Sequence, residues 1–186
     1  MPLTAFQATI GRLLAANRSE DSYLAGVAAM LAAPNTTRYS HDLDDFHDSA
    51  ERVAAAFAAD RETLGSAQYE VDIELSQPGY VRAIVRKGAD AAKIEWAQDS
   101  TWRFMPVVKS EEFGYQLHPV DLATNKVLAL AGRDELRVLL DTLYTCMTTC
   151  SRSVRWSGRP WARTPATRCF RFWKCSVVGA ACVLRN

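Results

Sequence analysis

The spacing of apolar residues changes along the chain, and the changes predict its secondary structure. Apolar side chains recur at helical spacing over residues 4–17, which predicts an amphipathic helix. The apolar run 23–31 predicts a second, short helix with Gly26 at or near its tight start, and Pro34 stops it. Residues 39–46 instead alternate between polar and apolar, which predicts a strand.

The same changes of period continue toward the C-terminal end. A hairpin is expected where two alternating runs flank a Pro-Gly turn, and two helices are expected on either side of Gly132. The expected elements are a helix at 49–59, paired strands at 69–75 and 80–86, a strand at 93–99, and helices at 119–131 and 134–144. The order predicts an α+β domain with a small mixed sheet flanked by helices.

The strand expected at 39–46 carries acidic residues at alternate positions. Asp42 and Asp44 fall on one face, with Cα atoms roughly 7 Å apart. Carboxylate oxygens suit Mg²⁺, which takes one or two protein carboxylates and leaves room for substrate phosphates. The pair therefore indicates phosphoryl or nucleotidyl transfer. A solvated loop or a helix cap is the simpler explanation of such a pair.

Composition is that of a globular chain, but charge is unevenly distributed. The 186 residues include 48% hydrophobic side chains and carry a formal net charge of +1. Residues 151–186 contain seven Arg, one Lys and no acid, whereas the remainder has 14 basic and 21 acidic side chains. The terminal segment therefore differs in kind from the domain before it.

No sequence feature indicates a membrane or an oxidising compartment. The N-terminal residues lack a basic segment followed by an apolar run, and no stretch approaches ~18 apolar residues. All five cysteines lie at 146–182, without a Cys-x-x-Cys pair, and their odd number argues against a finished disulfide framework. We therefore expect a cytoplasmic protein without a membrane partner.

Several short motifs together resemble one enzyme family. They are Tyr23-Leu-Ala-Gly, Arg38-Tyr-Ser-His-Asp-Leu-Asp-Asp-Phe-His-Asp, Lys93-Ile-Glu-Trp, Asp121-Leu-Ala-Thr-Asn-Lys-Val-Leu-Ala-Leu-Ala-Gly-Arg133, and Asp141. As a set, over roughly residues 20–144, they resemble the AbiEii/AbiGii toxin family of nucleotidyltransferases. That family shares the fold of the DNA polymerase β superfamily. The resemblance implies an enzyme with a nucleotidyltransferase fold.

The resemblance implies a role for each matching residue. Asp42 and Asp44 would hold catalytic Mg²⁺ together with the triphosphate. Glu95 would be the third carboxylate and would activate the acceptor hydroxyl, either as a metal ligand or as a base. Lys126 would contact the nucleotide, although a lysine whose stem covers apolar surface explains it equally. The implied nucleotide-binding residues are Gly26, Arg38, Ser40, Lys126, Arg137 and Asp141.

The resemblance also implies substrates and partners. The donor would be a nucleoside triphosphate, the acceptor a tRNA 3′ end, and the protein the toxin of a toxin–antitoxin or abortive-infection system with a cognate antitoxin. Two departures from the family pattern, Val27 and Val138, favour an alternative. A β-branched Val27 cannot adopt the positive φ available to glycine, so the chain would be a catalytically inactive nucleotide-binding remnant.

The segment 145–186 is predicted to be the product of a frameshift. If the third base of each codon is joined to the first two of the next, Trp173-Lys174 yields Glu and Trp161-Ala162 yields Gly. With GC-rich codons, the alternative reading has balanced charge and a helical apolar period. We therefore predict a nucleotidyltransferase-like domain at 1–144, followed by an out-of-frame, poorly ordered tail rather than a zinc or nucleic-acid module.

Overall fold

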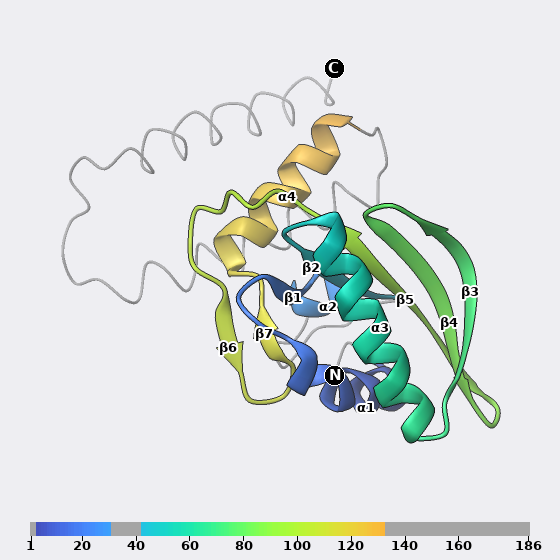
Figure 1. Ribbon diagram of the computed structural model, residues 1–186. Helices are drawn as coiled ribbons and strands as arrows, with labels where there is room; N and C mark the ends of the chain where they lie inside the picture. Colours follow the sequence, from blue (N-terminus) through green and yellow to red (C-terminus); the bar gives the residue numbers. More distant parts are fainter. Residues whose placement is uncertain (1–2, 31–41, 133–186) are drawn as a thin grey trace, which may run out of the picture. The chain divides into compact units, whose positions relative to one another are not determined.

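A seven-stranded mixed sheet organises the part of the chain that the structure describes. This computed structural model describes residues 3–30 and 42–132, all of which belong to one compact unit, Met1–Thr149. The strand order is β3-β4-β5-β2-β1-β7-β6 (Figure 1). In chain order the elements are α1 (Ala5–Leu14), the 3₁₀ turn η1 (Ala15–Asn17), β1 (Ser22–Ala25), α2 (Gly26–Met30), β2 (Asp42–His47), α3 (Ala50–Ser66), β3 (Glu70–Gln77), β4 (Tyr80–Lys87), β5 (Asp90–Gln98), β6 (Val108–Ser110), β7 (Gly114–Gln116) and α4 (Pro119–Gly132).

Strand β2 lies at the centre of the sheet. It pairs in parallel with β5 and antiparallel with β1, so it is enclosed on both edges. Helix α3 crosses the side of the sheet that faces the viewer in Figure 1. A mixed sheet with flanking helices was expected, and the structure confirms this architecture. The acidic residues of β2 are consequently placed on a strand that cannot shift its register freely.

The first helix forms where the apolar spacing predicts it. Thr4 accepts a hydrogen bond from the backbone of Gln7, whose side chain accepts one from the backbone of Thr4, giving a capping box at the start of α1. Ile10 and Leu14 are fully buried on the inner face of this helix. Helix α1 therefore packs its apolar stripe into the core as predicted.

The expectation of one helix over 23–31 is wrong in its first half. Ser22–Ala25 is strand β1, with all four residues buried between β2 and β7. A short apolar run bounded by polar residues has no period that separates a buried strand from a buried helix. The helical half is confirmed, because α2 begins at Gly26.

Helix α3 is capped as expected but is longer than predicted. Ser49 accepts a hydrogen bond from the backbone of Arg52. The helix continues past 59 to Ser66, because Asp60 and Leu64 are fully buried on its inner face. In the sequence, an acidic residue at position 60 suggests a side chain exposed to solvent. In the structure, Asp60 is buried and forms an ion pair with Arg18.

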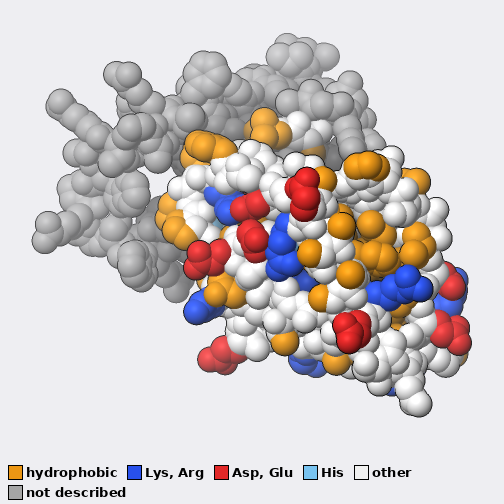
Figure 2. Space-filling view, in the orientation of Figure 1, with side chains coloured by type: hydrophobic (Ala, Val, Ile, Leu, Met, Phe, Trp, Pro, Cys, Tyr) orange, Lys and Arg blue, Asp and Glu red, His pale blue; other side chains and the backbone are white. Residues whose placement is uncertain are grey.

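The β3–β4 hairpin is confirmed, with Gly79 at φ +75° in its turn. Strand β3 forms one edge of the sheet and contains a bulge between Ile73 and Leu75, and these two residues are 46% and 42% exposed. Apolar side chains gather in Figure 2 on the side of the molecule where this hairpin extends past α3. The alternating pattern thus predicts the strand but not its exposure.

The remaining described elements extend the sheet on its other side. Strands β6 and β7 form a short antiparallel hairpin that the sequence pattern does not predict, and β7 joins the sheet through β1. Helix α4 confirms the helix expected at 119–131. The helix expected at 134–144 and the tail at 145–186 lie outside the described residues. None of the helices within 3–30 and 42–132 is long and apolar enough to span a bilayer.

Candidate functional site

Alternation along β2 divides its acidic residues between two environments. Leu43, Asp45 and His47 are buried on the side covered by α1 and α3. Asp42 and Asp44 are only partly buried and lie on the opposite face. The period-2 expectation that these two carboxylates share a face is met.

The parallel pairing of β2 and β5 adds two side chains to this face. Asp42 is opposite Lys93, and Asp44 is opposite Glu95. Ile94 and Trp96 point into the core, so Glu95 faces away from both, as the alternation predicts. We name Asp42, Asp44 and Glu95 the acidic cluster.

Two basic side chains contact the acidic cluster. The Nζ atom of Lys93 lies 2.9 Å from Oδ2 of Asp42 and 3.0 Å from Oε1 of Glu95. The same Oε1 accepts a hydrogen bond from Nε of Arg82 on β4 at 3.0 Å. Two of the three carboxylates are therefore already paired with cations supplied by the sheet itself.

The third carboxylate has a different electrostatic environment. Burial, together with the negative charges of Asp42 and Glu95, raises the pKa of Asp44 to about 7, and the positive charge of Lys126 acts in the opposite direction. Burial also raises the pKa of Glu95, but hydrogen bonding by Lys93 and the other neighbours outweighs it, so the pKa is lowered overall. Negative charge is thus least compensated at Asp44.

Gly26 lies directly against this carboxylate. Its φ is +63°, and a Cβ atom added there would stand 1.8 Å from Oδ2 of Asp44. Glycine is therefore required for both backbone conformation and space. Val27 is buried inside α2, and within the described ranges Gln68 is the sole non-glycine residue with positive φ. Val27 consequently needs no left-handed conformation.

Carboxylates at this position suit Mg²⁺ in chemical type. Asp42 and Asp44 provide the one or two protein carboxylates that Mg²⁺ usually takes. Across residues 3–30 and 42–132, however, no three His, Cys, Asp or Glu side chains converge as a metal-binding group. The ammonium of Lys93 lies between Asp42 and Glu95. Asp42 and Asp44 therefore suit the ion better than the three carboxylates of the acidic cluster together.

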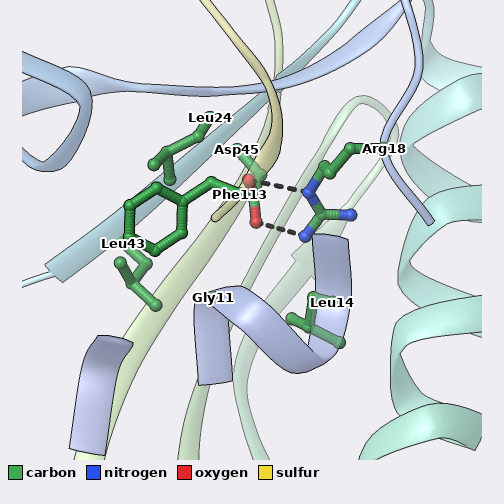
Figure 3. Close-up of a pocket in the computed structure, with 7 residues that line it drawn as sticks. All are labelled: Gly11, Leu14, Arg18, Leu24, Leu43, Asp45 and Phe113. Atoms are coloured by element: carbon green, nitrogen blue, oxygen red, sulfur yellow. Dashed lines mark hydrogen bonds and ion pairs between the residues drawn. The ribbon is translucent and has the colours of Figure 1, made fainter. Parts of the chain in front are cut away.

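The opposite face of β2 carries a buried ion-pair network. Arg18 donates from Nε and Nη2 to the two carboxylate oxygens of Asp45, at 3.0 and 2.6 Å (Figure 3). Its Nη2 also lies 2.8 Å from Oδ2 of Asp60 on α3, which accepts a further hydrogen bond from Nε1 of Trp96 at 2.7 Å. We name Arg18, Asp45 and Asp60 the buried triad. It ties β2 to α3 through the segment after η1.

His47 lies on the same buried face as the triad. Its two ring nitrogens and the hydroxyl of Ser22, opposite it on β1, are buried and have no hydrogen-bond partner among the described residues. Burial and the nearby positive charges of Arg18 and Arg52 lower the pKa of His47 to about 4. The imidazole is therefore neutral at physiological pH.

The structure brings together the predicted residues that it describes. Asp42, Asp44 and Glu95 share one face, Gly26 contacts Asp44, and the charge of Lys126 acts on the same carboxylate. The other predicted nucleotide-binding residues lie outside the described ranges, as does Val138, and their roles stay predictions. They are Arg38, Ser40, Arg137 and Asp141.

Sequence reasoning missed the basic side chains of both faces. Lys93 could have been found, because it precedes Glu95 by two positions on a predicted strand. Arg82 required the register of β4 against β5, which the sequence does not specify. The pairing of Arg18 with Asp60 spans 42 residues and has no local signal.

Two solved structures resemble this fold. A candidate nucleotidyltransferase from H. pylori is 16% identical, with a TM-score of 0.47, covering 66% of this chain and 56% of its own. JHP933 from Helicobacter pylori is 15% identical, with a TM-score of 0.49, covering 74% of this chain and 62% of its own. The chain thus spans less than two thirds of the length of either protein. No family model and no curated protein matches the sequence.

Proposed function

We propose that the chain is a Mg²⁺-dependent nucleotidyltransferase with its active site at the acidic cluster. One observation carries the proposal: Asp42 and Asp44 share a face of β2, Glu95 lies in register beside them, and the backbone of Gly26 packs against Asp44. Burial and then the negative charges of Asp42 and Glu95 raise the pKa of Asp44, and a bound cation would favour its ionised form. The motif resemblance supports the same reading.

In this proposal the residues of the chain have distinct tasks. Asp42 and Asp44 hold Mg²⁺, which when bound neutralises the charge that develops on the phosphates. Gly26 lets the backbone lie directly against the Asp44 carboxylate, because any Cβ there would collide with it. Lys126 supplies positive charge on the same side. Glu95 completes the acidic cluster as the third catalytic carboxylate.

The proposed substrates and biological role rest on the motif resemblance alone. We infer a nucleoside triphosphate as donor, a tRNA 3′ end as acceptor, and a cytoplasmic toxin opposed by a cognate antitoxin. The alternative is an inactive nucleotide-binding remnant. The pairing of Glu95 with both Lys93 and Arg82 favours this alternative, because a carboxylate held by two cations is a poor base.

A labelled-nucleotide transfer assay tests the proposal. Each nucleoside triphosphate, labelled at the α-phosphate, would be incubated with total tRNA and Mg²⁺, using this chain and a version with the alternative frame restored after Tyr144. Asp42→Ala should lower transfer more than about 100-fold, because the metal contributes several kcal/mol to transition-state stabilisation. Removing Mg²⁺ with EDTA should have the same effect.

Asp72→Ala is the matched control for this assay. Asp72 is also a strand aspartate, but it pairs with Arg86 at the exposed edge of the sheet, so transfer should persist. Nucleotide binding without transfer by both frames would favour the inactive remnant. Folded protein that neither binds nor transfers nucleotide would contradict the proposed function.

A further inference from the structure

Lys93 occupies an unusual position for a lysine on a strand. Its ammonium contacts two carboxylates, Asp42 at 2.9 Å and Glu95 at 3.0 Å, from a position directly opposite Asp42 in the β2–β5 register. Its side chain is 32% exposed, and the two carboxylate side chains are 17% and 18% exposed. The register of β2 and β5 thus positions this contact, which is partly shielded from solvent.

The charges around this ammonium are unequal. Glu95 receives positive charge from Lys93 and from Arg82, whereas Asp42 shares Lys93 with it. Asp44 faces the negative charge of both neighbouring acids, opposed by Lys126. A divalent cation that entered the acidic cluster would therefore find the carboxylate with the least nearby positive charge at Asp44. Beside Glu95 it would compete with the ammonium of Lys93 and the guanidinium of Arg82.

We propose that Lys93 is a built-in cation of the acidic cluster. Its ammonium takes the position between Asp42 and Glu95, so the cluster accepts a single divalent ion, held by Asp42 and Asp44. This inference rests on the proposed function and refines it, because it fixes the number of metal ions and the residue that limits it. Lys93 acts as a positioning residue that holds Glu95 away from the ion.

Metal binding measured directly tests this role without relying on turnover. Mn²⁺ is the probe, and its stoichiometry and affinity would be measured by titration calorimetry and by electron paramagnetic resonance of the free ion. The wild-type chain should bind one Mn²⁺. Lys93→Met removes the ammonium and keeps most of the stem, so the variant should bind a second ion or bind Mn²⁺ at least about 10-fold more tightly.

Two control variants keep the result interpretable. Lys109→Met removes an exposed lysine on β6, at the far edge of the sheet, and should bind Mn²⁺ as the wild type does. Lys93→Met/Glu95→Gln removes one positive and one negative charge together. This double variant should be at least as well folded as Lys93→Met and should return to one Mn²⁺, because it lacks the carboxylate that Lys93 holds away from the ion.

The outcomes separate this inference from the proposed function. One Mn²⁺ bound by both the wild type and Lys93→Met with equal affinity would overturn the role of Lys93 and leave the aspartate site intact. Two ions bound by the wild type would overturn it in the same way. Absence of Mn²⁺ binding in every folded variant would overturn both. If Lys93→Met is unstable alone, Mn²⁺ must raise its thermal unfolding midpoint more than that of the wild type.

Discussion

The two faces of β2 treat neighbouring aspartates in opposite ways. Asp45 points into the core, where Arg18 and Asp60 complete a network whose side chains are 0–4% exposed. Asp44 points the other way, toward two further acids. Burial raises the pKa of both aspartates, to about 7 for Asp44, where the two acids add to the effect, and to about 6 for Asp45, where the charge of Arg18 opposes it. Adjacent residues of one strand thus serve stability on one face and, in our proposal, chemistry on the other.

The difference shows how charge is managed in each place. In the buried triad one guanidinium bridges two carboxylates, so few donors and acceptors are left without a partner. In the acidic cluster Lys93 and Arg82 pair with Asp42 and Glu95, whereas Asp44 meets the negative charge of both acids, opposed by the charge of Lys126. A face built for stability satisfies its charges internally, whereas a face built for a ligand leaves part of its charge to be balanced by that ligand.

The largest expected effect comes from breaking the buried triad. Arg18→Met leaves Asp45 and Asp60 facing each other without their cation, and should lower the free energy of unfolding by about 3–5 kcal/mol. Chemical denaturation measures the change. Arg12→Met is the control, because Arg12 pairs with Glu112 at the surface and should cost less than about 1 kcal/mol. Equal losses would contradict the distinction between the faces.

A smaller effect is expected from His47. Its pKa is lowered to about 4 in the folded chain, whereas an unfolded histidine titrates near 6.5. The unfolded state therefore binds more protons between these values, and stability falls as pH decreases from about 6.5 to 4. His47→Leu should remove about 3 kcal/mol of this dependence. If the pH dependence of the unfolding free energy were unchanged in the variant, His47 would not be its source.

Substitution of Gly26 should give the smallest of these changes in stability, but it should also affect the acidic cluster. Gly26→Ala and Gly88→Ala both place a Cβ on a backbone with φ of +63°, yet Gly88 has nothing within 4 Å of that Cβ. Both should lose about 1–2 kcal/mol from backbone strain. Gly26→Ala alone displaces the Asp44 carboxylate, so only this variant should lose transfer. Similar transfer by the two variants would mean that the contact with Asp44 is unimportant.

Local patterns predict the fold better than they predict its internal pairings. The alternation of β2 correctly assigns Asp42 and Asp44 to one face, because side-chain direction in a strand depends only on neighbouring positions. The hairpin at Gly79 and the cap at Ser49 are equally local signals. The helix expected over 23–31 fails at strand β1, because the four buried residues of this strand show no period.

The parts that could not be predicted depend on long-range contacts. The helix expected at 49–59 ends before Asp60, whose burial is explained by its ion pair with Arg18 and by the hydrogen bonds it accepts from Asn17 and Trp96. Lys93 and Arg82 reach the acidic cluster through strand register, which depends on the whole sheet. The composition of the site follows from local sequence, whereas its charge balance follows from topology.

The most direct measurement compares Asp44→Asn with Asp45→Asn, isosteric changes at adjacent residues, for both unfolding free energy and nucleotide transfer. Asp44→Asn should be at least as stable as the wild type, because it removes excess negative charge, and should transfer no nucleotide. Asp45→Asn should lose about 3 kcal/mol of stability, since it weakens the pairing of Arg18, and should retain transfer wherever it remains folded. Loss of stability in Asp44→Asn, or loss of transfer in fully folded Asp45→Asn, would contradict the division of β2 into a chemical face and a structural face.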